Sequence, residues 1–414
     1  MTTSTEALSP ALSLEERLRA ALANLWSMRD EFFAFYRERE EEVVGMFVAL
    51  LSGKPMLIIG PPGTAKSLML ENLCRNTVGA RFHYQLLTKY VTDKDLFVSR
   101  VTVRERQVGD EKTIEFHNDP TGRLGDCHLA FLDEVFLCSH TALTALLSLL
   151  ANGTFSVNAG DVLRSPVLLI VGASNRLPGP EDGYLLHFLD RFLLRYRVDY
   201  LADPRNFVSL LADEKPMPGA TIQLHEIELL QKCVRRVQVP KPVLLALSEV
   251  RTRLQAKNVR PSDRRWHECL KLLKAHALFR GRTHAVLEDI TILQHSLWTL
   301  ESEIKVVREA VLATSNAEQA KAALLYDEAQ QAWEVVKDKD GADPSHLTEL
   351  TAAEGRLRGI LGELEQLTQN DARIRTYGNR VRVWLKAVKR LEGVDDALID
   401  DEEPSGEPID LTRP

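Results

Sequence analysis

Residues Gly60-Pro-Pro-Gly-Thr-Ala-Lys-Ser67 lie between a short apolar stretch, Met56–Ile59, and a helical pattern over residues 67–74. A glycine-rich turn between a strand and a helix points backbone N–H groups and a helix N-terminus at phosphate oxygens. Lys66 would add a positive charge at the β- and γ-phosphates, and the Ser67 hydroxyl would ligate Mg²⁺. This stretch predicts a phosphate-binding loop.

One position of this loop departs from the general motif, which has glycine directly before the lysine where this chain has Ala65. Alanine adopts helical backbone angles and adds only a methyl group, so we expect nucleotide binding to persist. The residues expected to contact the nucleotide are Gly60, Pro61, Pro62, Gly63, Thr64, Ala65, Lys66, Ser67 and Leu68.

A second motif, Leu129-Ala-Phe-Leu-Asp133-Glu134, is an apolar stretch that ends in two acids. A buried strand with this ending delivers carboxylates to the edge of a parallel sheet where ligands bind. We expect Asp133 to hold Mg²⁺ and Glu134 to act as the general base that polarises the attacking water. Together the two motifs predict binding of ATP or GTP, followed by hydrolysis.

Two further polar residues follow apolar segments. Residues 167–171 form a third strand-like stretch that leads to Asn175, whose amide would position the water or touch the γ-phosphate. Arg191 stands where an apolar helix would end, and an ion pair with Asp190 is the simpler alternative for it.

The apolar stretches at 56–59, 129–132 and 167–171 alternate with helical patterns, which indicates an α/β fold with a parallel sheet covered by helices on both faces. A continuous helix is expected over residues 13–51.

Four domains are expected along the chain. Residues 1–215 form the nucleotide-binding domain, and residues 216–300 form an all-α domain. Heptad-spaced leucines predict a helical hairpin, coiled coil or three-helix arm over residues 301–393. Residues 394–414 form an acidic tail expected to be disordered.

The net charge of −7 is carried by this tail, which has eight acids and one base. Because the remaining chain is balanced, a globally basic nucleic-acid-binding protein is disfavoured. A local basic stretch over residues 251–265 keeps nucleic-acid remodelling as the alternative function. The tail itself is either a solubilising end or a ligand for a basic surface on a partner.

Targeting and redox features are few. No apolar run reaches the roughly 18–20 residues of a spanning helix, and no secretory signal is visible. The five cysteines are odd in number and lack the close pairs of zinc or redox sites, so a cytoplasmic setting is expected.

The chain resembles the MoxR branch of the AAA+ ATPases, and most closely its RavA-like members. The resemblance covers about residues 35–298. It depends on the motifs above, including the alanine before Lys66, and on Ser262-Asp-Arg-Arg-Trp266 and Leu278-Phe-Arg-Gly-Arg282. It implies an AAA+ P-loop core with an all-α lid, and hairpin insertions at residues 101–116 and 154–164.

The resemblance also implies roles and partners. Asn175 would be sensor 1, Arg191 an arginine finger that reaches a neighbouring subunit's nucleotide, and Arg264, or alternatively Arg265, sensor 2. It implies a hexameric ring that uses ATP and Mg²⁺, a partner with a von Willebrand factor A domain, and a chaperone-like role in protein maturation or metal insertion. A nucleotide-gated scaffold with negligible turnover is a third possibility, which the intact Glu134 argues against.

Overall fold

The computed structural model describes residues 13–108, 111–156, 162–212, 216–339, 343–367 and 372–392. The chain divides into two compact units. Unit 1 comprises residues 1–201 and 212–315, and unit 2 comprises residues 202–211 and 316–414. The candidate site residues all belong to unit 1.

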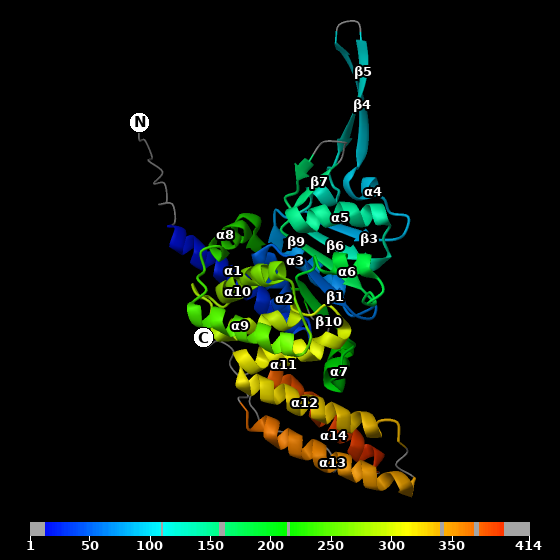
Figure 1. The fold of residues 1–414 in the computed structure, drawn as a ribbon, viewed down its shortest axis with the longest axis vertical. Helices are drawn as coiled ribbons and strands as arrows, with labels where there is room; N and C mark the ends of the chain where they lie inside the picture. Colours follow the sequence, from blue (N-terminus) through cyan, green and yellow to red (C-terminus); the bar gives the residue numbers. More distant parts are fainter. Residues whose placement is uncertain are drawn as a thin grey trace, which may run out of the picture. The chain divides into compact units, whose positions relative to one another are not determined.

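The centre of unit 1 is a five-stranded parallel sheet in the order β10-β1-β9-β6-β3 (Figure 1). All residues of β1 and β9 are buried, because both faces of the sheet are covered, as parallel sheets require. The predicted α/β fold with a parallel sheet is thereby confirmed. The strands are β1 (Met56–Ile59), β3 (Phe82–Leu86), β6 (Leu129–Asp133), β9 (Leu169–Ser174) and β10 (Leu194–Arg197).

Strand register brings the candidate site together. Ile59 at the end of β1 pairs with Ser174 at the end of β9, and β9 in turn pairs with β6. The residues that follow these strands therefore meet at one edge of the sheet. Helices α3 (Lys66–Arg75), α5 (His140–Asn152) and α6 (Gly183–Leu189) belong to this core.

The expected helix over residues 13–51 is divided into α1 (Leu14–Phe35) and α2 (Glu40–Ser52). Between them, Glu38 adopts a left-handed backbone with φ 54°. The Tyr36 hydroxyl donates to the carbonyl of Leu68 at 3.0 Å and accepts from Asn72 Nδ2 at 2.6 Å. The break therefore anchors the N-terminal segment on α3, the helix of the phosphate loop.

Two antiparallel hairpins leave the sheet, at the places where the sequence predicted them. The longer one, β4 (Arg100–Val108) and β5 (Glu111–Asp119), projects from the core (Figure 1). The shorter one pairs β7 (Thr154–Ser156) with β8 (Val162–Arg164). The remaining small elements are α4 (Asp93–Phe97), the 3₁₀ helices η1 (Leu124–Asp126) and η2 (Val135–Leu137), and the paired strands β2 (Thr77–Val78) and β11 (Ile222–Gln223).

The helical lid also belongs to unit 1. It contains α8 (Leu224–Val234), α9 (Lys241–Ala256), α10 (Asp263–Phe279), η3 (Leu287–His295), η4 (Glu301–Glu303) and α11 (Ile304–Ser315). Helix α11 packs on α9 and η3, and its residues Val307 and Val311 belong to the same buried core. The helical arm therefore begins at Asn316 in the structure, whereas the sequence placed its start at residue 301.

Unit 2 contains α12 (Ala317–Val336), α13 (Pro344–Glu365), α14 (Ala372–Leu391) and all of α7 (Pro204–Ala212) except its last residue. Leu350, Leu357 and Leu364 of α13 repeat every seven residues and are buried in its core. The Tyr326 ring stacks on Tyr377, with ring centroids 4.5 Å apart. In the described part of the chain no helix is long and apolar enough to cross a membrane. The acidic tail, expected to be disordered, lies outside the described residues.

Candidate nucleotide-binding site

The phosphate loop connects β1 to α3, and its first glycine is required by close packing. A Cβ atom at Gly60 would lie 2.2 Å from the backbone oxygen of Val198, so no larger residue fits there. Gly63 has φ +80°, which favours glycine. Thr64 is buried, and its hydroxyl donates to the carbonyl of Pro61 at 2.9 Å. These contacts hold a tight turn at the N-terminus of α3.

Ala65 departs from the expectation of a helical backbone. It precedes α3 with φ 62° and ψ 22°, which is the left-handed conformation. That expectation was wrong, because the loop must reverse direction at the residue before Lys66. Left-handed geometry costs a residue with a Cβ atom about 1–2 kcal/mol, which explains why the general motif has glycine here.

The ammonium group of Lys66 is held by its own loop. Its Nζ donates to the carbonyls of Gly60 at 2.6 Å and Pro61 at 2.8 Å. It also lies 3.5 Å from Oδ1 of Asn175. Burial lowers the pKa of Lys66, and the carboxylates of Asp133 and Glu134 act in the opposite direction. The lysine therefore shares one electrostatic environment with both acids.

The two acids at the end of β6 have different partners. Asp133 Oδ1 accepts from the backbone N–H of Glu134 at 3.0 Å, and Oδ2 accepts from the Tyr84 hydroxyl at 3.2 Å. Glu134 has a left-handed backbone with φ 54° and ψ 47°, and its Oε1 accepts from Asn175 Nδ2 at 2.5 Å. Backbone strain of this kind is common in functional sites, where surrounding contacts maintain it.

Tyr84 is a site residue that the sequence reasoning missed. It lies on β3, beside β6 in the sheet, and its ring stacks on Phe131. Burial, followed by the Asp133 charge, raises the pKa of Tyr84, so the hydroxyl stays a donor to that carboxylate. Only the strand order of the sheet brings these residues together, and no sequence motif signals it.

The donor set fits Mg²⁺ bound together with a nucleotide. Ser67 lies in the first turn of α3 and Asp133 at the end of β6, so each contributes an oxygen of the kind that Mg²⁺ prefers. No cluster of three or more His, Cys, Asp or Glu side chains suited to a metal occurs among the described residues. A magnesium ion held by these two residues would take its other ligands from phosphate and water, as it commonly does.

The three predicted arginines gather around Asp190. The Asp190 carboxylate forms ion pairs with Arg264 and with Arg265, the latter at 2.7 Å. Arg265 is 3% exposed and also donates to the carbonyl of Ser296 at 2.6 Å. Although burial acts in the opposite direction, Arg265 and Arg264 lower the pKa of Asp190. The guanidinium of Arg265 is thus buried and fully engaged by contacts within the chain, whereas the Arg264 side chain is 52% exposed.

Arg191 does not form the alternative ion pair with Asp190, whose carboxylate contacts the two lid arginines instead. Its Nε atom is buried and has no hydrogen-bond partner among the residues that the structure describes. Burial, together with the Arg264 charge, lowers the pKa of Arg191. The described part of the chain thus supplies no acceptor for this N–H group.

Arg191, Arg264 and Arg265 line a cavity of about 260 Å³, here called the arginine cavity. Its lining includes Lys54 and Glu268 but, in the described ranges, no residue of the phosphate loop. The structure therefore brings Lys66, Asp133, Glu134 and Asn175 together in one group and the three arginines in another.

A phosphate loop after β1, paired acids at the end of β6 in the same parallel sheet and an all-α lid define an AAA+ ATPase class of fold. A solved structure of a candidate ATPase from Cytophaga hutchinsonii shares this fold, with a TM-score of 0.57 and 18% identity, over 73% of this chain and 97% of that one.

The chain belongs to the MoxR family. The family model described as the MoxR domain in the MoxR-vWA-beta-propeller ternary systems matches residues 23–232, and an AAA lid domain matches residues 242–311. Two uncharacterized proteins of Methanocaldococcus jannaschii are similar. One is 30% identical over 70% of this chain and 74% of its own length, and the other is 29% identical over 70% and 76%.

Proposed function

We propose that this MoxR-family protein hydrolyses ATP to ADP and phosphate at the site formed by the phosphate loop, Asp133, Glu134 and Asn175. The observation that supports it best is the contact between Asn175 and Glu134, because it connects the expected general base to the expected γ-phosphate sensor. The choice of ATP over GTP follows from the family.

In this proposal each side chain has a separate role in ATP hydrolysis. Glu134 accepts the proton of the attacking water, and Asn175 orients the carboxylate and the water. Lys66 leaves the carbonyls of Gly60 and Pro61, which it contacts in the structure, to bind the phosphates. Mg²⁺, bound by Ser67 and Asp133, would neutralise charge on the phosphate oxygens.

We propose that Arg191 and Arg264 act on the nucleotide of a neighbouring copy, in a hexameric ring. The supporting observation is the buried, unpartnered Nε of Arg191 in a cavity lined, within the described chain, by no phosphate-loop residue. A cation supplied in this way is worth about 10³–10⁵ in rate in other nucleotidases. Arg265 is a positioning residue in this scheme, because Asp190 and Ser296 engage it.

The wider proposal is an ATP-driven protein remodeller or chaperone for maturation or metal insertion. The matched family description names von Willebrand A and β-propeller components, which supports partners of both kinds. The RavA-like assignment depends on the lid motifs alone and is part of this proposal. A cytoplasmic setting is consistent with the five free cysteines.

The alternative, nucleic-acid remodelling, depended on the basic stretch 251–265. In the structure Arg251 pairs with Asp263, Arg253 with Glu249, and the two lid arginines with Asp190. Arg264 is already assigned to the nucleotide in the proposal above, which leaves Lys257 and Arg260 as the basic residues of this stretch without an ion pair in the described chain. The stretch therefore does not favour nucleic-acid remodelling.

A mixing experiment tests the proposal. Lys66→Ala removes nucleotide binding and Arg191→Ala removes the trans cation, so each variant alone should lose phosphate release. In equal mixture, the intact arginine of the first variant should serve the intact pocket of the second. If copies mix at random in a closed ring, about a quarter of the interfaces would be functional. Mixed rings shown by light scattering that recover no activity would refute the trans assignment.

A separate measurement tests the partner. Co-purification with a von Willebrand A protein should be lost in a chain that ends at Ser315, while ATP hydrolysis remains. Retained co-purification would place the partner on unit 1.

A further inference from the structure

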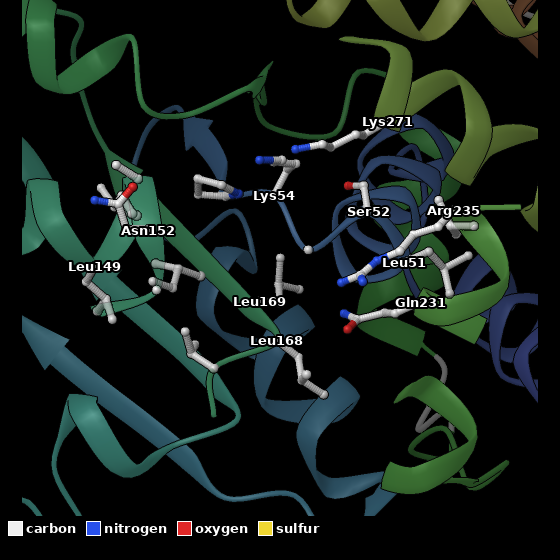
Figure 2. Close-up of a pocket in the computed structure, with 18 of the residues that line it drawn as sticks. Leu51, Ser52, Lys54, Leu149, Asn152, Leu168, Leu169, Gln231, Arg235 and Lys271 are labelled. Carbon is white, nitrogen blue, oxygen red and sulfur yellow. The ribbon is translucent and has the colours of Figure 1, made fainter. Parts of the chain in front are cut away.

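Unit 1 contains a second pocket, of about 700 Å³, that the nucleotide chemistry does not use. Figure 2 shows it between the segment that precedes β1, the end of α5, the start of β9, and the lid helices α8 and α10. We call it the basic pocket. Its volume lies within the range typical of ligand sites, about 300–1,000 Å³.

The lining of the basic pocket is strongly positive. It includes no aspartate or glutamate among the described residues, although the whole chain has a net charge of −7. In Figure 2 the nitrogen-bearing ends of Lys54 and Lys271 lie close together, on the other side of the pocket from Gln231. The basic side chains that line it are Lys54, Arg164, Arg235, His267, Lys271 and Lys274.

Part of this charge has no internal counter-charge. Glu268, outside the pocket lining, pairs with Lys54 and, at 3.0 Å, with Lys271. In the described part of the chain no carboxylate pairs with Arg164, Arg235 or Lys274. Among the described residues, the one hydrogen bond of Lys274 Nζ goes to the backbone oxygen of Arg235, at 3.5 Å. Unpaired cations that converge on one pocket favour an anionic occupant.

The floor of the pocket is apolar. Leu149, Leu168 and Leu169 lie across from the basic side chains in Figure 2, and Leu150, Val234 and Leu270 also line the site. A phosphate ion or a nucleic-acid backbone makes no use of aliphatic side chains. A peptide in which acids alternate with aliphatic residues uses both parts of the pocket.

The pocket also adjoins the arginine cavity. The two share Lys54, Pro55, Leu150, Ala151 and Asn152 in their linings. If Arg191 faces a neighbouring copy, as proposed above, the basic pocket lies beside that neighbour too. The choice of a neighbouring copy as the source of the occupant rests on that proposal.

We propose that the basic pocket binds the C-terminal acidic segment, residues 394–414, of a neighbouring copy. This segment, Val394-Asp-Asp-Ala-Leu-Ile-Asp-Asp-Glu-Glu403 and beyond, has eight acids and one base, and it interleaves them with Val394, Leu398 and Ile399. Its charge and its aliphatic residues match the two parts of the pocket. Docking would connect the copies of an assembly by a contact independent of nucleotide.

A binding measurement tests the proposal. The chain that ends at Gly393 keeps every described helix and strand and cannot compete with an added ligand. A fluorescein-labelled peptide of residues 394–414 should bind this chain, with anisotropy as the readout. Affinity should fall at least about tenfold between 0.05 and 0.3 M salt, because screening shortens the range of the charges.

Matched variants locate the site. Arg235→Glu with Lys274→Glu should weaken peptide binding at least tenfold, while the control Lys241→Glu, an exposed lysine outside the pocket, should change it less than twofold. A peptide with Leu398 and Ile399 replaced by serine keeps its charge and should bind several-fold more weakly. If the reversed charges disturb folding, the neutral variant Arg235→Gln with Lys274→Gln replaces them. It should also weaken peptide binding.

Four outcomes would overturn the proposal: no binding of the peptide, equal loss with Lys241→Glu, no effect of the serine peptide, or tighter binding of a single-stranded oligonucleotide of similar length. In the full-length chain, tail-to-pocket cross-linking between differently tagged copies should be detected. Cross-links confined to single copies would contradict the neighbouring-copy source. Each of these failures leaves ATP hydrolysis and the mixing experiment unaffected, so it is distinguishable from failure of the proposed function.

Discussion

The side-chain amide of Asn175 bridges Lys66 and Glu134, the proposed general base: its Nδ2 lies 2.5 Å from Oε1 of Glu134, and its Oδ1 lies 3.5 Å from Nζ of Lys66. Each end of the amide faces the charge that it complements. In this arrangement Glu134 is engaged before any water reaches it. Nucleotide binding would have to draw Lys66 toward phosphate and so loosen one side of the bridge.

Replacing Glu134 by glutamine should separate binding from hydrolysis. Glutamine keeps an oxygen that accepts from Asn175 but cannot take a proton from water. We expect steady-state phosphate release to fall by about 10²–10⁴, with ATP affinity changed less than about threefold, which is under 1 kcal/mol. The exposed lid acid variant Glu249→Gln is the control. Equal turnover of wild type and Glu134→Gln would show that another group is the base.

Replacing Asn175 by aspartate should shift the pH dependence of hydrolysis. Two carboxylates at this separation cannot both ionise easily, so the apparent pKa of the pair rises. Activity should then recover partly at alkaline pH, whereas Asn175→Ala should be low at every pH. Superimposable pH–rate profiles for the two variants would argue against direct contact between residues 175 and 134 during turnover.

Asp190→Asn should destabilise unit 1, because it leaves the buried guanidinium of Arg265 without a counter-charge. Breaking such a pair costs about 3–5 kcal/mol. The control is Asp263→Asn, which breaks the exposed pair with Arg251 and should cost less than about 1 kcal/mol. Urea unfolding at pH 7 measures both. A lowered folded-state pKa means that the contribution of Asp190 is present above its ordinary value of 3.8 and is lost as the pH falls.

Ala65→Gly should stabilise the protein slightly. Glycine removes the cost of the left-handed backbone, about 1–2 kcal/mol, and adds about 0.4–1 kcal/mol of chain entropy to the unfolded state. The expected net gain in the free energy of unfolding is the difference of the two, about 0–1.6 kcal/mol. The control Ala246→Gly, in the middle of α9, should instead lower the free energy of unfolding by about 1 kcal/mol. A loss in both variants would mean that residue 65 is not left-handed in solution.

Glu42→Gln should change how stability depends on pH. Burial, with the neighbouring charge of Glu41, raises the pKa of Glu42 to about 8. The unfolded chain ionises near 4.5, so the stability that Glu42 permits is fully present below that pH and is lost as the pH rises toward 8. Glutamine cannot ionise, so the stability of the variant relative to that of the wild type should increase between pH 5 and pH 8.5. A parallel pH dependence of the two thermal midpoints would contradict the burial effect. The control is Glu228→Gln, at an exposed position of α8.

Much of the fold was predictable because apolar runs report burial directly. The strands at residues 56–59 and 129–132 are correct to within a residue, since every position in them is buried. The break at Glu38 was not predictable from periodicity, because it depends on the contact of Tyr36 with α3, a helix distant in sequence. The end of the lid at Ser315 likewise depends on the packing of α11, which continues the same helical pattern.

The site was predictable in its residue types and less so in its geometry. Lys66, Asp133, Glu134 and Asn175 converge because parallel strands end at one edge. The left-handed backbone of Glu134 and the role of Tyr84 depend on strand order and local turns, which a single sequence does not encode in any motif. Arg264 is exposed and Arg265 is buried, and this difference between adjacent arginines could not be predicted from the sequence.

The Asp190 carboxylate has a mechanical consequence. It ties the first turn of α10 to the residue that precedes Arg191, so a rotation of the lid would pull directly on the backbone of that arginine. The lid and Arg191 would then move together as a rigid body. In the proposed ring, the nucleotide state of one copy would thus influence when its neighbour hydrolyses ATP, and we would expect sequential rather than independent hydrolysis.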